Sequence, residues 1–176
     1  MYKVDFGPTV TASEIVTLEI AKLNSGIDYT SDDILLQLFV DAVAYEIENY
    51  IGYPVLQRDS AVVTLRYWET VYGLPIHFNE ITGITYKNNE NQQVALAVDD
   101  DYDVFENELT LINDVPADFK GPITITGKAG YANADIPKDM VDAALLMFSE
   151  RELFRENRPV KLNTAAQSKL RPYKKY

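Results

Sequence analysis

Residues 129–158 decide the fold class, and they read AGYANADIPKDMVDAALLMFSERELFRENR. We expect a strand over residues 123–128 to end at Gly130 and, after a short polar turn, a helix over about residues 137–157. Pro137 suits the first turn of that helix, because its φ is preset and its missing N–H would have no partner there. Over two turns the helix is apolar on more than one face. A surface helix shows a single apolar stripe, so we expect this one to be covered on several sides, by a central position or by a neighbouring subunit.

Two further helices are expected ahead of the strands. The first, over about residues 11–24, begins with Thr11 and Glu14 at capping-box spacing. The second, over about residues 31–51, has acidic residues in its first turn, where they suit the helix dipole, and Gly52 follows its last turn. Its apolar positions again cover more than one face.

Between residues 57 and 128 the hydrophobic period changes to two, as in Val63, Leu65 and Tyr67. Turn residues separate several such runs, which predicts four to six short strands in a small antiparallel β meander or barrel. The polar, basic sequence of residues 159–176 predicts a flexible, extended tail. The order helix, helix, strands, long C-terminal helix and tail is typical of an α+β fold, with one domain over residues 1–158.

Composition bounds the class of protein. The chain has 176 residues, of which 47% are hydrophobic and 24% are charged, which suits one globular domain. It contains no cysteine, which excludes a disulfide framework, a thiolate zinc site and a cysteine nucleophile. No stretch approaches the ~20 apolar residues that cross a membrane. The first residues lack the apolar core of a signal peptide, so we expect cytosolic synthesis and no membrane contact.

The charge is unevenly distributed along the chain. The formal net charge is −11, from 16 basic and 27 acidic residues. Five of the basic residues and none of the acidic ones lie in residues 159–176, so residues 1–158 carry 11 positive charges against 27 negative ones. Nucleic-acid binding needs a basic surface, because phosphate neutralisation supplies most of the affinity. The acidic body would repel DNA, and the tail alone is suited to an acidic partner.

The acidic turn Asp99-Asp100-Asp101-Tyr102-Asp103, with Glu106 and Glu108 behind it, imitates the start of a calcium loop. Such a loop requires glycine at its sixth position and a bidentate glutamate at its twelfth. Val104 and Thr110 occupy these positions here, so a solvated turn between two strands is the preferred interpretation. A metal-binding module or an enzyme that uses this cluster remains an alternative.

His77, the single histidine, lies in the alternating run Ile76-His77-Phe78, which is typical of an ordinary strand residue. The sequence has no Gly-x-Ser-x-Gly elbow, no phosphate loop and no dinucleotide fingerprint. We therefore expect no enzyme activity, no catalytic or metal-binding residues and no cofactor.

Two sets of residues could contact partners. Arg151, Arg155 and Arg158 form a basic edge at the end of the long C-terminal helix. They could simply complement the helix dipole, or they could pair with carboxylates of another chain. The 12 tyrosines and Trp68 suit a protein interface or a strand core equally well.

Taken together, these features resemble the head–tail connector (adaptor) proteins of long-tailed bacteriophages and prophages. The resemblance rests on collinear pieces that cover most of the chain, including a paired aspartate leading to an Ile-Glu-x-Tyr-x-Gly ending, and Gly-Tyr followed by Ile-Pro and an apolar helix. The matching positions are the first helix over residues 11–23; Asp32-Asp33, Leu36, Val40, Ala42, Ala44, Ile47, Glu48, Tyr50 and Gly52; Leu74-Pro75; Ile81 to Tyr86; Asp101-Tyr102; Ala129-Gly130-Tyr131; and Ile136-Pro137, Met140, Ala144, Leu145 and Arg155-Glu156.

The resemblance implies a structural virion protein of the neck, assembled in the host cytoplasm as a homo-oligomeric, dodecameric ring beneath the capsid portal. Such a ring extends the DNA channel, through which DNA passes without specific binding, and presents a surface to a head-completion or tail-side protein. Apolar helix faces suit head-to-tail packing of subunits, and an acidic body suits a channel that does not retain DNA. The residues expected in subunit packing are Leu36, Phe39, Val43, Ile47, Met140, Leu145, Met147 and Phe148. Those expected to engage the portal are Arg151, Arg155, Arg158, Lys161, Lys169, Arg171, Lys174 and Lys175.

Three alternatives remain at this point. Another phage ring protein, a head-completion stopper or a tail terminator, would be a small β-barrel without two leading helices. The acidic turn could mark a metal-binding module or an enzyme. A bacterial interaction domain unrelated to phage would share the α+β composition.

Overall fold

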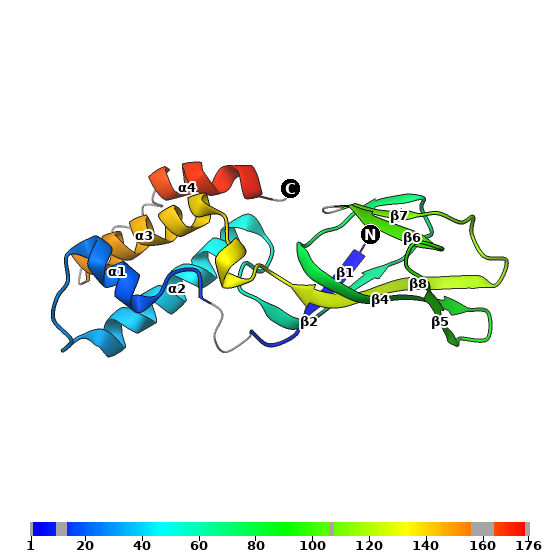
Figure 1. Cartoon of the computed structure of the whole chain (residues 1–176), viewed down its shortest axis with the longest axis horizontal. Coiled ribbons are helices and arrows are strands. Elements are labelled where there is room, and N and C mark those ends of the chain that lie inside the picture. Colours follow the sequence, from blue (N-terminus) through cyan, green and yellow to red (C-terminus); the bar gives the residue numbers. More distant parts are fainter. Residues whose placement is uncertain (1, 10–13, 106–107, 156–163, 175–176) are drawn as a thin grey trace. The chain divides into compact units, whose positions relative to one another are not determined.

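The computed structural model describes all residues except 1, 10–13, 106–107, 156–163 and 175–176. The chain divides into two compact units. A β unit comprises residues 1–11 and 57–131, and a helical unit comprises residues 12–56 and 132–176 (Figure 1). Each unit joins segments that are distant in sequence, because strands and helices each bury their apolar faces against elements of their own kind.

The larger sheet of the β unit has five strands in the order β1-β2-β8-β4-β5, and all neighbouring strands are antiparallel (Figure 1). Its strands are β1 (Tyr2–Phe6), β2 (Arg58–Leu65), β8 (Phe119–Ala129), β4 (Phe78–Asn88) and β5 (Gln93–Leu96). A smaller antiparallel sheet has the order β3-β7-β6, formed by β3 (Val71–Gly73), β7 (Glu108–Leu111) and β6 (Tyr102–Phe105).

The prediction of antiparallel strands is confirmed, whereas the meander and the barrel are wrong. The described strands form two open sheets, and the last strand, β8, lies at the centre of the larger one. Ile125 of β8 is in register with Val63 on one side and Ile84 on the other, and all three are fully buried. A strand with deeply buried residues is best shielded from solvent at the centre of the sheet. Its position in the sequence does not decide its position in the sheet.

The helical unit begins with α1 (Leu18–Ser25), which starts later than the predicted residue 11. Thr17 is its N-cap, with an extended backbone and an Oγ1 that accepts from the Ile20 N–H at 3.3 Å. Glu14 lies ahead of the helix, and Thr11 lies outside the described residues. Thr17 provides the cap, because its hydroxyl satisfies an N–H that the helix leaves unpaired.

The second helix, α2 (Asp33–Ile51), agrees with its predicted bounds. Gly52 ends it in the left-handed conformation with φ 90°, and its N–H donates to the Glu48 carbonyl at 2.9 Å. Glycine adopts this backbone without steric cost, which explains why the helix stops there.

The third helix, α3 (Lys138–Leu153), follows a 3-10 turn over Asn133–Asp135. Pro137 is its N-cap, one position earlier than predicted, and Arg155 lies beyond its last turn. Met140, Ala143, Ala144 and Phe148 are buried, and α1, α2 and α4 of the same chain all contact α3. Helices of its own chain therefore provide the cover that its apolar faces predict, and a neighbouring subunit is not needed.

The predicted extended tail is wrong for residues 164–174. They form α4 (Thr164–Leu170) and a 3-10 turn over Arg171–Tyr173, and α4 packs against α3. Ala166 and Leu170, four residues apart, are each 1% exposed. Two apolar residues at helical spacing are enough to fasten one short helix, although the composition around them is polar. In the described part of the chain, no helix is both long and apolar enough to cross a membrane.

Candidate interaction surfaces

The arginines expected at a partner interface pair with carboxylates of the helical unit itself. Arg151 donates from Nη2 to Oε1 of Glu46 on α2. Arg155 donates from Nη1 to Oδ2 of Asp32 at 2.5 Å and from Nη2 to the hydroxyl of Tyr29 at 3.1 Å. The hydrogen bond from Arg155 lowers the pKa of the Asp32 carboxyl and raises the pKa of the guanidinium. These two arginines join the end of α3 to α2 within one chain.

The basic residues near the C-terminus are also engaged within the chain. Lys169 lies 3.0 Å from Oδ2 of Asp142 and 3.7 Å from Oδ1 of Asp139, both on α3. Lys174 lies over the ring of Tyr50, 5.1 Å from its centroid. Of the expected docking residues, Arg155, Arg171 and Lys174 are exposed, while Arg158, Lys161 and Lys175 lie outside the described residues.

Most residues expected in subunit packing belong to the core of the helical unit. Leu36, Ile47 and Met140 are fully buried, and Val43 and Phe148 are each 2% exposed. Phe39, Leu145 and Met147 are half-buried. The five buried side chains pack within their own chain.

The exposed apolar face of α2 lies opposite the face that is buried in the helical unit. Ile34 is 86% exposed, Leu38 59% and Tyr45 64%. With the exposed Asp41 they follow spacings of four, three and four residues, which places them on one side of a 3.6-residue helix. We call Ile34, Leu38, Asp41 and Tyr45 the α2 stripe. The sequence predicts that α2 is apolar on several faces, but periodicity alone cannot say which face the chain leaves uncovered.

A second surface, distinct from the α2 stripe, is a groove in the β unit with exposed aromatic residues. It has a volume of about 190 Å³, and β1 and β3, which border it, are outer strands of their sheets. Tyr2, Tyr67 and Val71 are 58%, 59% and 47% exposed at its rim. We call this the edge groove, lined by Tyr2, Leu65, Arg66, Tyr67, Glu69, Val71, Tyr72 and Gly73.

Hydrogen bonds hold the loop beside the edge groove in one conformation. The hydroxyl of the buried Tyr72 donates to the carbonyl of Tyr67 and accepts from the N–H of Glu69 at 2.5 Å. Burial raises the pKa of the Tyr72 hydroxyl, so it remains a donor at neutral pH. The sequence marks these tyrosines only as interface or core residues, and the fold assigns Tyr67 to the surface and Tyr72 to the support below it.

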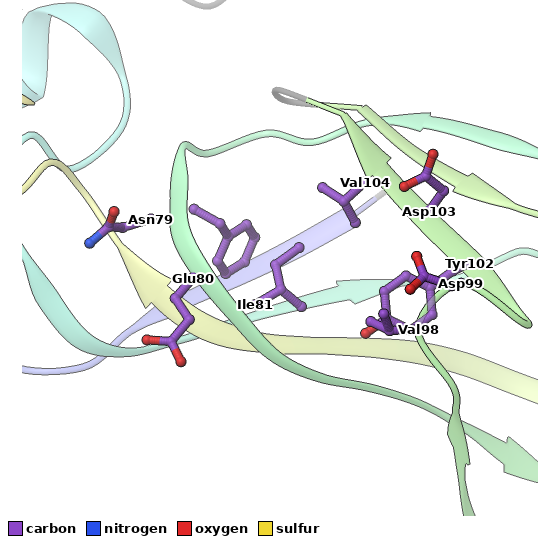
Figure 2. Close-up of a pocket in the computed structure, with 9 residues that line it drawn as sticks. Asn79, Glu80, Ile81, Val98, Asp99, Tyr102, Asp103 and Val104 are labelled. Carbon is purple, nitrogen blue, oxygen red and sulfur yellow. The ribbon is translucent and has the colours of Figure 1, made fainter.

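The acidic turn borders a cleft of about 310 Å³ between the start of β4 and β6 (Figure 2). Figure 2 shows Asp99 and Asp103 beside this cleft, whereas the side chain of Glu80 points away from both. Lys128 lies 2.6 Å from Glu80. Asp101 accepts from the Ala97 N–H at 2.7 Å and from Nδ2 of Asn113 at 2.8 Å, so it stabilises the turn.

The described residues include no group of three or more potential ligands placed to hold a metal ion. Glu106 lies outside the described residues. His77 stacks on Tyr131, with 4.3 Å between ring centroids and 13° between ring planes, which is a packing contact. Neither feature brings together a nucleophile, a base and a pocket.

Comparison with known proteins gives one family and several structures of the same fold. Residues 15–115 match the family described as Phage gp6-like head-tail connector protein. No curated protein matches the chain.

Solved structures cover nearly all of the chain. A chain from the neck of an empty gene transfer agent (GTA) particle, computed with C6 symmetry, has a TM-score of 0.68 at 13% identity and covers 99% of this chain and 96% of that one. A chain from the virion of a native gene transfer agent particle has a TM-score of 0.69 at 13% identity, with 98% and 95% covered. A chain from the native neck computed with C12 symmetry has a TM-score of 0.64 at 15% identity, with 96% and 94% covered. At these identities the likeness shows a shared fold.

Proposed function

Because the chain belongs to the Phage gp6-like head-tail connector protein family, we propose that it is a structural subunit of the neck of a phage-like particle. The family match carries this proposal, since residues 15–115 include α1, α2 and the strands β2 to β7. The two N-terminal helices and the open sheets favour a connector over a stopper or a tail terminator built on a small β-barrel.

In the neck, the chain is proposed to form a homo-oligomeric ring of twelve copies. Chains of the same fold occur in neck particles whose structures were computed with C6 and C12 symmetry, which supports a ring without fixing its copy number here. A closed ring needs a head-to-tail interface between two different surfaces, and the α2 stripe and the edge groove both expose apolar side chains. The ring would lie beneath the portal and extend the DNA channel towards a head-completion or tail-side protein, in the virion after assembly in the host cytoplasm.

The charge of the chain supports passage of DNA rather than its retention. The net charge is −11, and a negative lining repels a negative polymer that must slide past it. Of the residues proposed for portal docking, Arg155, Arg171 and Lys174 are exposed, and Arg155 and Lys174 contact Asp32 and Tyr50 of the same chain. The proposal therefore rests first on Arg171, and it keeps Arg158, Lys161 and Lys175, which lie outside the described residues.

The ring is tested by native mass spectrometry and electron microscopy of the purified chain, alone and with the portal protein of the same particle. We expect closed rings in at least one of these conditions. A chain that stays monomeric in both would contradict the proposal. Portal docking is tested with Arg171→Glu, which should weaken binding to the portal, with Lys87→Glu as an exposed control in the β unit.

A further inference from the structure

We propose that the α2 stripe of one copy binds in the edge groove of the next copy, and that this contact closes the ring. The inference rests on the proposed function, and it names the two surfaces that meet. Each surface belongs to one unit of the chain, so the argument depends on the internal structure of each unit alone.

The α2 stripe has the chemistry of an interface that the chain itself does not cover. Its apolar members Ile34, Leu38 and Tyr45 are all more than half exposed, and the first and last lie about 16 Å apart along the helix at 1.5 Å per residue. The opposite face of α2 is already buried against the rest of the helical unit. Apolar side chains aligned along one helix face are typical of a helix that docks in a groove.

The edge groove has side chains suited to binding the α2 stripe. Tyr2, Tyr67 and Val71 stand exposed around it, with the buried Leu65 and Tyr72 beneath. Tyrosine and arginine are the residues in which interface energy is concentrated. The hydrogen bonds of the Tyr72 hydroxyl hold the 67–72 loop in place before any partner arrives, which reduces the entropy cost of binding.

Charge distinguishes the two surfaces and gives the contact a direction. Arg66, an exposed residue of the edge groove, has no hydrogen bond or ion pair in the part of the chain that the structure describes. Asp41 lies within the α2 stripe, where its only described partner is the neutral Nε2 of Gln37 at 3.0 Å. The carboxylate of Asp41 and the guanidinium of Arg66 are complementary, and Glu69 is the other charged residue that lines the groove. Desolvation at an interface strengthens such a pair.

The pairing of two different surfaces explains assembly into a ring rather than into dimers. Each copy presents one stripe and one groove, so each copy donates to one neighbour and receives from the other. Such a heterologous contact is the kind that closes rings. Two stripes facing each other would bring Asp41 near its own symmetry mate, and like charges disfavour that arrangement.

The absence of cysteine from the chain permits a clean cross-linking test. The double variant L38C/Y67C places one thiol on the stripe and one at the groove, at side chains that are each 59% exposed. In rings of this variant, mild oxidation should give a ladder of covalent oligomers on a denaturing gel. The matched control L38C/K87C, with its second thiol at an exposed residue outside the groove, should give no ladder.

A charge exchange tests the same contact without a new bond. Arg66→Asp and Asp41→Arg should each weaken subunit association by on the order of tenfold per interface. The double variant D41R/R66D should recover most of that loss, whereas Lys87→Asp should leave association unchanged. Circular dichroism of each variant checks that the monomer remains folded.

Four results would overturn the inference. Rings of L38C/Y67C that give no ladder, or a charge exchange that does not restore association, would show that the ring uses other surfaces, and the proposed function would stand. A cross-link formed within one chain would show that the stripe and the groove of the same copy meet. Failure to obtain rings in any condition would contradict the proposed function, and the inference would fall with it.

Discussion

Arg155 and Asp32, separated by 123 positions in the sequence, meet at 2.5 Å between Nη1 and Oδ2. Asp32 is the N-cap residue of α2 and Arg155 follows the last turn of α3, so the pair joins the start of one helix to the end of another. The Arg155 side chain, which was expected at a partner interface, therefore pairs within its own chain.

The Asp32–Arg155 pair should make stability depend on acidic pH. The hydrogen bond from Arg155 lowers the folded-state pKa of Asp32 below its ordinary value of 3.8, so the stabilisation is complete above that value and is lost as the pH falls through the lower folded-state pKa. On acidification from neutral pH, the free energy of unfolding should therefore fall less in Arg155→Ala than in the unmodified chain. Urea unfolding at a series of pH values measures this, and identical pH profiles would contradict it.

The buried face of α2 should govern folding, and its exposed face should not. Ile47→Ala should cost about 2–5 kcal/mol in the free energy of unfolding, because it leaves a cavity at a fully buried position. Leu38→Ala, on the exposed side of the same helix, should change it by less than about 0.5 kcal/mol. Thermal and urea unfolding of the monomer measure the loss of stability in each variant. Equal losses would show that the assignment of the two faces is wrong.

Gly127 of β8 should tolerate no side chain. A Cβ atom there would lie 2.3 Å from the carbonyl oxygen of Glu80 on the neighbouring β4, so the backbone of one strand must move. Gly127→Ala should therefore destabilise the β unit by about 1–3 kcal/mol. Gly73→Ala is the matched control, since its Cβ would meet no atom within 4 Å. Urea unfolding of both variants checks the contrast.

Loss of the α4 contact should loosen α3. Leu170→Ala removes a side chain that is 1% exposed and should cost about 2–5 kcal/mol, with faster amide hydrogen exchange in α3. Arg171→Ala, at the exposed neighbouring position, should change neither quantity. Unchanged exchange in Leu170→Ala would mean that α4 does not stabilise α3.

The acidic turn should bind no calcium at physiological concentration. Both oxygens of the Asp101 carboxylate already accept hydrogen bonds, and calorimetric titration with calcium should give no binding heat. Asp101→Ala should instead lower stability by about 1 kcal/mol, through loss of those hydrogen bonds, with Asp103→Asn as a neutral control. A saturable calcium signal abolished by either change would restore the metal site as a candidate.

Much of the fold could be predicted from local signals. The bounds of α2 follow from its acidic first turn and from Gly52, and the strands follow from a period of two. Local signals failed at the start of α1, where the capping-box spacing of Thr11 and Glu14 predicted a helix from residue 11 and the N-cap is Thr17. They also failed at α4, because few apolar residues pack this helix against the rest of the chain. Ala166 and Leu170 are its buried residues.

The candidate interface was harder to predict than the fold. Leu36 and Ile34 are two residues apart, and both are apolar, yet one is fully buried and the other is 86% exposed. Periodicity predicts that the helix has two apolar faces, but it does not predict which of them the rest of the chain will cover. The same is true of Arg151 and Arg155, each of which pairs with a carboxylate more than 100 positions away.

The sequence by itself determined the α+β class, the positions of most helices and strands, the acidic character and the connector family, because these depend on short-range patterns and on collinear motifs. Only the tertiary structure decided that β8 lies at the centre of its sheet, that the long C-terminal helix is covered by its own chain, and that the α2 stripe and the edge groove remain exposed. The physical reason is that burial depends on which distant segments meet. A residue's neighbours along the chain do not reveal which surface will be left to a second molecule.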